Sequence, residues 1–352
     1  MRKLRILYAG SPFASAMLLE KLIQNALNCD SANREFANRD FANCDSGDAN
    51  YEFAGVLTNP PSARGRHKEL LPTEVAQCAA SHGIPVFSFE HLDSAAREAI
   101  LPLQADLLLC FDYGRIFGPK FLAMFPLGGI NLHPSLLPKY RGCTPVPAAL
   151  LNGDEFLGVS VQKLALKTDE GDILGCTKIP LNGTETTQSL MDGDGTTSPV
   201  IEAGFGLLSK ILADICASDC DCKGNFVLPA ASAQCGESSY TPFIKKEDGR
   251  IDWSKPAVEI CRKIRAYTPW PGCFTSSAGI QLKILKAFAQ QESAFAAGEA
   301  GKVLGSDKKN GIYIQTGNGV LVVSELQWEK KKAMDFKSFL NGSRDFIGTV
   351  LE

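Results

Sequence analysis

The stretch NLHPSLLPKYRG, residues 131–142, places an asparagine and a histidine two positions apart at the end of an apolar run. Residues two apart on a strand point to the same side of it, so Asn131 and His133 are predicted to face one cleft. An amide can donate hydrogen bonds to an oxyanion, and an imidazole can donate one or move a proton. The pair therefore suits a carbonyl carbon under attack. The alternative for His133 taken alone is a buried histidine with a structural role.

A carboxylate that could accept a proton is predicted in the segment KTDEGDIL, which holds Asp169 and Asp172 around a glycine. An ordinary hairpin turn between two strands is the alternative for this segment. The chain has no G-x-S-x-G elbow and no Ser-His-Asp order, so direct transfer is favoured over a covalent enzyme intermediate. Residue chemistry alone thus predicts the transfer or hydrolysis of a small acyl group.

The elements around these residues are typical of a doubly wound α/β fold with a mostly parallel sheet, because short apolar runs alternate with helical patterns. Strands are predicted at 5–10, 52–59, 85–89, 105–114, 128–133, 159–166 and 173–181, and helices at 14–28, 72–82, 94–101, 119–124 and 144–152. Ligands of such sheets bind at the carboxyl ends of the strands, where Asn131 and His133 fall. The first turn, AGSPFASAM, has one glycine and no G-x-G-x-x-G, and this argues against NAD.

A length of 352 residues predicts two domains. The first is predicted at 1–217, followed by a linker at 218–239 that is rich in small residues. Close strand-like runs with glycine turns predict a smaller antiparallel β-barrel, OB-like, at 240–352, with helices at 256–266 and within 335–341. The copies ANREF, ANRDF and ANCDS predict a low-complexity surface insertion at 26–50.

Charge is divided unevenly along the chain, whose formal net charge is −3. From Thr241 to Glu352 there are 17 basic and 12 acidic residues, against 19 and 27 in the rest. This indicates a polyanionic partner for the second domain, or merely a soluble surface. No apolar run is long enough for a membrane span, so a cytoplasmic protein is expected.

Twelve cysteines are expected to be free thiols in a reducing compartment. A zinc site is one hypothesis for the cluster near the linker, although its spacing lacks paired C-x2-C clips. A cysteine-rich linker without metal is favoured. The cluster comprises Cys216, Cys220, Cys222 and Cys235.

NLHPSLLPKYRG, followed further along by DEGDIL, resembles the signature of the folate-dependent formyltransferases. That family carries Asn-x-His, then Ser-Leu-Leu-Pro, then an Asp-x-Gly turn. RGRHKELLPTEV and the tail RIDWSKPAVEICRKIRAYTPWPG also resemble members that act on tRNA, and the likeness covers nearly all of the chain except 26–50 and 218–235.

The resemblance implies a Rossmann-like catalytic domain that transfers the formyl group of 10-formyltetrahydrofolate to the free amino group of methionyl-initiator tRNA. It implies that Asn131 holds the formyl oxygen, that His133 stabilises the oxyanion, and that Asp169 orients His133 and assists proton removal. The family's catalytic aspartate precedes the glycine by two, so Asp172 is the weaker candidate. It also implies a folate pocket lined by Ser135, Leu136, Leu137 and Pro138, and no metal.

The resemblance further implies basic residues that contact tRNA, in a loop at 63–68 and in the second domain. Glu69 stands where a lysine is usual, and a solvated basic loop is the alternative. The expected contacts are Arg64, Arg66, Lys68, Lys245, Lys246, Arg262 and Arg265. We expect a monomer.

Three other kinds of function stay open: a formyltransferase for an amino-sugar nucleotide or a glycinamide ribonucleotide, a hydrolase of formyltetrahydrofolate, and a tRNA-binding module without transfer. The IDWS…PWPG tail argues against the hydrolase, because such an enzyme would need no basic second domain. The tail argues less strongly against a sugar-nucleotide formyltransferase, since such enzymes can carry a similar second domain.

Overall fold

The computed structural model describes residues 2–32, 50–64, 69–218 and 226–352. The chain divides into two compact units, each treated by itself below. Unit 1 comprises Met1–Cys143, Phe156–Pro180 and Met191–Thr241, and unit 2 comprises Thr144–Glu155, Leu181–Leu190 and Pro242–Glu352. Two segments that the linear domain prediction assigned to the first domain therefore group with unit 2. Most of the predicted insertion, residues 33–49, lies outside the described residues.

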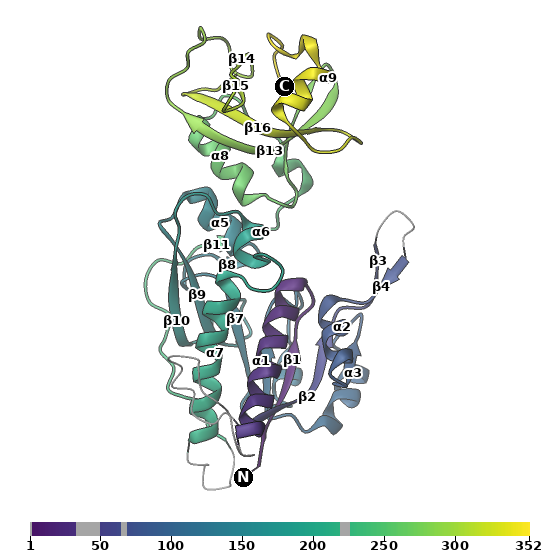
Figure 1. The fold of residues 1–352 in the computed structure, drawn as a ribbon. Coiled ribbons are helices and arrows are strands. Elements are labelled where there is room, and N and C mark those ends of the chain that lie inside the picture. The colour runs from purple at the N-terminus through teal and green to yellow at the C-terminus, as the bar shows by residue number, and fades with distance from the viewer. Residues whose placement is uncertain (1, 33–49, 65–68, 219–225) are drawn as a thin grey trace. The chain divides into compact units, whose positions relative to one another are not determined.

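Unit 1 is built on a seven-stranded sheet in the order β10–β9–β7–β6–β1–β2–β5 (Figure 1). The strands are β1 (Leu4–Ala9), β2 (Tyr51–Thr58), β5 (Val86–Ser88), β6 (Leu107–Cys110), β7 (Gly129–His133), β9 (Phe156–Lys163) and β10 (Ile173–Pro180). The five from β5 to β7 run parallel, whereas β9 and β10 run antiparallel at one edge. The predicted mostly parallel sheet is confirmed.

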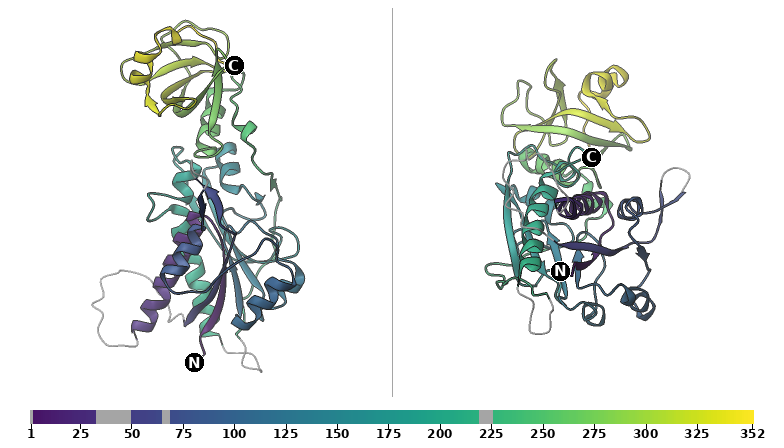
Figure 2. Two further views of the ribbon diagram at one scale, coloured as in Figure 1. Left: turned by 90° about the vertical axis from the view of Figure 1, so that its right-hand side faces the viewer. Right: turned by 60° about the horizontal axis from the view of Figure 1, so that its bottom comes forward.

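Helices cover both faces of this sheet, as Figure 2 shows. On one face lie α1 (Phe13–Ala32), α2 (Glu74–Ser81) and α7 (Pro199–Ala217), with α1 in contact with the other two. On the other face, α3 (Ser94–Ile100), the 3-10 turn η1 (Leu101–Leu103) and α4 (Pro119–Leu122) contribute to the cluster that contains Leu7 and Ala9 of β1. Burial on both faces explains why β1 reads as a continuous apolar run rather than an alternating one.

Unit 2 contains a six-stranded antiparallel sheet in the order β12–β13–β16–β15–β14, with β17 paired to β16. The strands are β12 (Cys273–Ser277), β13 (Ile280–Gln290), β14 (Val303–Ser306), β15 (Ile312–Gln315), β16 (Val320–Trp328) and β17 (Met334–Asp335). The C-terminal tail bonds to both ends of this sheet: Thr349 O accepts from Val303 N (2.8 Å), and Glu352 exchanges two bonds with Ser276. The predicted barrel is thus closed by the last residues of the chain, which cover the sheet edges.

The helices of unit 2 include those predicted around the barrel. They are α5 (Pro145–Asn152), α8 (Ala257–Ala266) and α9 (Phe336–Gly342), with 3-10 turns η2 (Lys246–Gly249) and η3 (Arg344–Phe346); α6 (Thr187–Met191) spans the boundary between the units. In α8 the apolar Ile260 and Ile264 are buried at a spacing of four, which is the helical period. Among the described residues, none of the helices combines the length and apolar character that crossing a membrane requires.

Two small sheets were not predicted. β3 (Ser62–Arg64) and β4 (Glu69–Leu71) form an antiparallel pair around the basic loop. β8 (Arg141–Gly142) and β11 (Tyr240–Thr241) pair in parallel, which brings the region after the predicted linker onto the NLHPSLLPKYRG loop.

Candidate active site

Strand β7 presents Asn131 and His133 at its carboxyl end, between β6 and β9. His133 is buried, whereas Asn131 is partly exposed. Within the described parts of the chain, the Asn131 side chain makes no hydrogen bond to protein, although its amide carries two donors. A polar group left open at the end of a central strand is available to a ligand.

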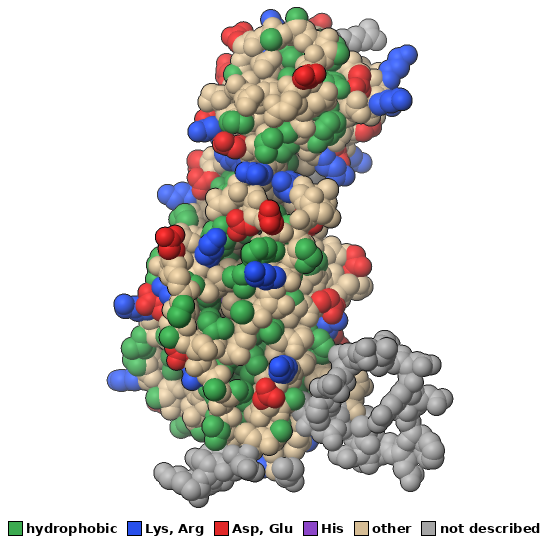
Figure 3. All heavy atoms as spheres, turned by 90° about the vertical axis from the view of Figure 1, so that its left-hand side faces the viewer, with side chains coloured by type: hydrophobic (Ala, Val, Ile, Leu, Met, Phe, Trp, Pro, Cys, Tyr) green, Lys and Arg blue, Asp and Glu red, His purple; other side chains and the backbone are tan. Residues whose placement is uncertain are grey.

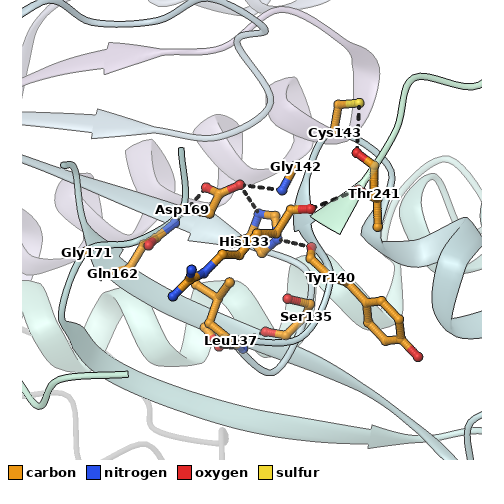
Figure 4. A network of polar contacts seen from close by, with 12 residues as sticks. His133, Ser135, Leu137, Tyr140, Gly142, Cys143, Gln162, Asp169, Gly171 and Thr241 are labelled. Carbon is orange, nitrogen blue, oxygen red and sulfur yellow. Dashed lines mark hydrogen bonds and ion pairs between the residues drawn. The ribbon is translucent and has the colours of Figure 1, made fainter. Parts of the chain in front are cut away.

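The imidazole of His133 is oriented by the backbone. Its Nε2 lies 2.9 Å from the carbonyl oxygen of Tyr140. Because a carbonyl oxygen only accepts, Nε2 carries a hydrogen and donates it, and Nδ1 is the nitrogen left to exchange a proton. Nδ1 faces the carboxylate of Asp169, whose Oδ2 is 3.7 Å away (Figure 4). This gap exceeds a normal hydrogen bond, so a proton passes between them only through a third group or after a small movement.

Asp169 is held from two sides in the connection between β9 and β10. Its Oδ1 accepts a hydrogen bond from Gln162 Nε2 (2.7 Å) and its Oδ2 one from the backbone N–H of Gly142 (2.8 Å). The residue has a φ of 55°, in the left-handed region that a non-glycine residue seldom adopts. Asp172, the other candidate carboxylate, is exposed. The structure therefore brings Asp169 to His133, and not Asp172.

Two glycines permit close backbone contacts at this site. A Cβ on Gly171 would lie 1.7 Å from the carbonyl oxygen of Lys163, so only glycine lets the turn after Asp169 close onto β9. A Cβ on Gly158 would lie 2.1 Å from the backbone nitrogen of Leu136, where the Ser-Leu-Leu-Pro loop approaches β9. Both loops of the site therefore pack against β9, and each packing contact requires a glycine.

The Ser-Leu-Leu-Pro loop is held by two hydroxyl groups, Ser135 of the loop itself and Ser160 of β9. Ser135 Oγ donates to Lys139 O (2.6 Å), and Ser160 Oγ donates to Ser135 O (2.7 Å) while accepting from Leu137 N (3.3 Å). Ser135 and Pro138 are buried, whereas Leu136 and Leu137 stay partly exposed. The hydroxyl of Ser135 therefore serves the loop, and the two leucines are the members that can touch an apolar ligand.

Two thiols near the site remain protonated. Burial raises the pKa of Cys110 to about 12, with the charges of Asp112 and Asp169 adding to the effect. Desolvation likewise raises the pKa of Cys143, and Asp169 contributes. Since the thiolate is the nucleophilic form, neither residue is suited to covalent catalysis.

Sequence reasoning missed Gln162, Arg141 and Gln234, which complete the polar network. Gln234 lies in the predicted linker, yet its Nε2 donates to the carbonyl oxygens of Asp169 and Gly171, both at 2.8 Å. A glutamine in a segment of small residues gave no sign of this, because the contacts span more than 60 positions.

The basic residues predicted to contact tRNA differ in whether the structure describes them and in how far they are exposed. Arg66 and Lys68 lie outside the described residues, and Arg64 is in β3. Arg262 packs over Gly153, and Arg265 Nη1 is 3.5 Å from Glu185 O, with burial lowering its pKa. Lys245 and Lys246 are exposed, and Lys246 lines a shallow depression of about 290 Å³.

The cysteines of the zinc hypothesis are only partly described. Cys220 and Cys222 lie outside the described residues, while Cys216 Sγ contacts Asn50 O and Cys235 Sγ contacts Ala233 O. The described residues hold one group of potential ligands, Glu20, Cys78 and His82, in which His82 Nε2 already contacts Glu20 Oε2 at 2.7 Å.

Comparison with known proteins identifies relatives along the whole chain. A family described as formyl transferase matches residues 25–194, and its C-terminal domain matches residues 243–344. Methionyl-tRNA formyltransferase of Treponema denticola is 44% identical over 84% of this chain and 91% of its own length. The enzyme of the same name from Borreliella burgdorferi is 36% identical over 86% and 92%.

Solved structures share the fold. HypX from Aquifex aeolicus superimposes with a TM-score of 0.61 at 16% identity, covering 98% of this chain and 48% of that protein. WlaRD, a sugar 3N-formyl transferase, gives 0.58 at 16% identity, covering 94% and 100%. At these identities the likeness bears on the fold alone.

Proposed function

The chain belongs to the methionyl-tRNA formyltransferase family, and we propose that its Asn131, His133 and Asp169 transfer a formyl group from 10-formyltetrahydrofolate to the amino group of methionyl-initiator tRNA. The enzyme is a one-carbon transferase of translation initiation. One observation supports these three residues. Asp169 Oδ2 lies 3.7 Å from Nδ1 of His133, and His133 shares strand β7 with Asn131, whose amide is open.

The amide of Asn131 stabilises the carbonyl oxygen as it becomes negative under attack by the amine. Its N–H donors have no protein partner among the described residues, so no hydrogen bond within the protein must be broken before they bond to that oxygen. A preorganised donor of this kind contributes roughly 10²- to 10³-fold in rate.

His133 and Asp169 manage the protons. The neutral amine becomes positively charged as it bonds to the formyl carbon and must then lose a proton, and the folate nitrogen that leaves must gain one. Asp169 accepts the first proton directly or through a water, and His133, whose Nδ1 lies 3.7 Å from this carboxylate, is placed to pass a proton on. The bond from His133 to Tyr140 O keeps Nδ1 on the Asp169 side throughout.

10-Formyltetrahydrofolate supplies the formyl carbon. The residues present fit it: a flat apolar heterocycle would lie against the partly exposed Leu136 and Leu137, next to the open polar groups of β7. Among the fold relatives, HypX has been solved in complex with tetrahydrofolic acid, and WlaRD in the presence of 5-N-formyl-THF.

Contacts with tRNA are assigned to exposed basic residues of unit 2 and to the loop between β3 and β4. Lys246 and Arg250 line the shallow depression together with Glu247, Phe274 and Gln281, so two basic side chains outnumber one carboxylate where a phosphate would bind. Arg262 and Arg265 are partly engaged within unit 2, so Lys245 and Lys246 are the stronger candidates. On the face in Figure 3, basic and acidic side chains are interspersed, which favours a few positioned contacts over a broad basic surface.

The chain is further proposed to act as a cytoplasmic monomer. Every described contact of the site comes from unit 1 of a single chain, so a second copy need contribute nothing. Aminoacylated tRNA and reduced folate are both supplied where translation occurs. Light scattering on the purified chain tests the monomer, and a dimer mass would overturn it.

The function is tested by mixing the purified chain with 10-formyltetrahydrofolate labelled in the formyl group and methionyl-initiator tRNA. Acid-stable label on the tRNA is the expected product. Label released as formate in the absence of any acceptor identifies the hydrolase. Transfer only to an amino-sugar nucleotide, supplied in a parallel reaction, identifies the other transferase.

A further inference from the structure

Residues 232–241, here called the strap, form part of unit 1 although their composition is typical of a linker. The strap is anchored at both ends. Ser232 exchanges two backbone bonds with Ile173 at the start of β10 (2.8 and 2.9 Å). At the other end Ser239 accepts from Arg141 N (2.8 Å) and donates to Pro138 O (3.2 Å), and β11 then pairs with β8. The strap therefore joins the two loops that carry the proposed active site.

Gln234 is the strap residue that turns inward. It is partly buried, whereas the residues on either side of it, from Ser232 to Ser238, are exposed. Its Oε1 accepts from Arg141 at both Nε (3.1 Å) and Nη2 (2.7 Å). Arginine has only donors, so the oxygen of Gln234 must face it and the amide NH₂ must face the other way. The orientation of this side chain is thus determined.

The NH₂ group of Gln234 bridges the turn that carries Asp169. It donates to Asp169 O and to Gly171 O, both at 2.8 Å, and lies 3.3 Å from Gln162 Oε1. Gln162 in turn donates to the Asp169 carboxylate. The turn holds Asp169 at a positive φ of 55°, which aspartate tolerates better than most residues, and contacts from outside the turn add to its stability.

We propose that Gln234 is a positioning residue for formyl transfer, acting through Asp169. Its amide locks the backbone of the Asp169 turn to Arg141 in the loop that follows His133, and so sets the gap between the carboxylate and the imidazole. The inference rests on the proposed function of Asp169. The inference makes the strap part of the active site through Gln234, a residue that touches neither substrate.

Contacts of Glu170 also join the Asp169 turn to the strap and to Arg141. Glu170 accepts a hydrogen bond from Tyr240 OH (2.5 Å) and lies 3.4 Å from Arg141 Nη1. Tyr240 is exposed and Glu170 is partly exposed, so solvent screens this contact more than it screens the amide bridge of the partly buried Gln234. Glu237, in contrast, is an exposed strap residue with no hydrogen bond or ion pair in the described structure.

The test compares Gln234→Ala with the control Glu237→Ala in single-turnover transfer to methionyl-tRNA. Displacing a reacting group by about 1 Å reduces the rate by about 100-fold, so a loss of about 10- to 100-fold in kcat is expected for Gln234→Ala. KM for either substrate should stay unchanged, since Gln234 contacts neither, and Glu237→Ala should behave like the unaltered chain. Gln234→Glu keeps the acceptor for Arg141 but loses both donors, so it should not restore the rate.

The double variant Gln234→Ala/Asp169→Asn separates positioning from general damage. If Gln234 acts through Asp169, its loss should change the rate of the Asp169→Asn enzyme by less than about twofold. An equal loss in both backgrounds, or normal kcat in Gln234→Ala, overturns the proposal. Failure of the proposed function looks different, because the unaltered chain would then place no label on tRNA at all.

Discussion

Replacing Asp169 with asparagine removes the proton acceptor while keeping the shape of the site. Both carboxylate oxygens accept hydrogen bonds, from Gly142 N and from Gln162 Nε2. An asparagine can keep its oxygen toward Gly142, whose N–H cannot turn, and place its NH₂ toward Gln162. The amide of Gln162 can then flip to accept, at the loss of its 3.3 Å contact with Gln234. We expect the free energy of unfolding to fall by about 1 kcal/mol at most, the net worth of one such hydrogen bond.

The effect on rate should be much larger. An amide cannot accept the amine's proton, and loss of a positioned base reduces rates by about 10²- to 10⁴-fold. A 100-fold loss corresponds to about 2.7 kcal/mol of transition-state stabilisation. We therefore expect Asp169→Asn to lose at least about 100-fold in single-turnover transfer while its melting temperature hardly moves.

The assay uses enzyme in excess over methionyl-tRNA, acid quenching, and label recovered on the tRNA. Asp172→Asn is the matched control, because this carboxylate is exposed and three residues along the same segment. It should transfer at the unaltered rate. A rate for Asp169→Asn within about threefold of the unaltered chain, less than 1 kcal/mol, would refute a proton-accepting role for Asp169.

Four further predictions concern the oxyanion donor, the glycine turn, the tRNA contact and the cysteines. Asn131→Ala should lose about 10²-fold in kcat and leave tRNA affinity unchanged, as measured by filter binding, because the amide acts on the developing oxyanion; weaker tRNA binding would contradict this. Gly171→Ala should lower the free energy of unfolding by about 1–3 kcal/mol in urea titration, since its Cβ would lie 1.7 Å from Lys163 O; an unchanged midpoint would contradict the close contact. Lys246→Ala should weaken tRNA binding and reduce the slope of log K against log salt by about one, and an unchanged slope would exclude a phosphate contact. Native alkylation followed by mass spectrometry should label the exposed cysteines before the buried ones, whose thiols have pKa values raised to about 12 by burial. Among the cysteines whose burial the structure describes, the exposed set is Cys143, Cys176 and Cys235, and the buried set is Cys110, Cys261 and Cys273.

Local pattern was enough for the architecture and for half of the site. Apolar runs bounded by turns predicted the seven strands of unit 1 to within a few residues. The signal is least interrupted in inner strands such as β6, which are buried on both faces, whereas the edge strands β5 and β10 are partly exposed. The spacing of Asn131 and His133 placed both on one side of β7, since alternation along a strand is a property of the chain itself. The motif resemblance then indicated which chemistry such a pair performs.

Only the tertiary structure distinguished Asp169 from Asp172 by geometry, because two carboxylates in one glycine turn look alike until the turn is docked on β9. It also joined the strap to the site and closed the barrel with the C-terminal tail, contacts that no local period records. Gln234 meets Asp169 across 65 positions of sequence. The composition of a segment reflects how much of it faces solvent. Residues 232–241 look like a linker because most of their side chains are exposed. The one side chain that turns inward becomes visible only when its partners from β8 and the β9–β10 turn are in place.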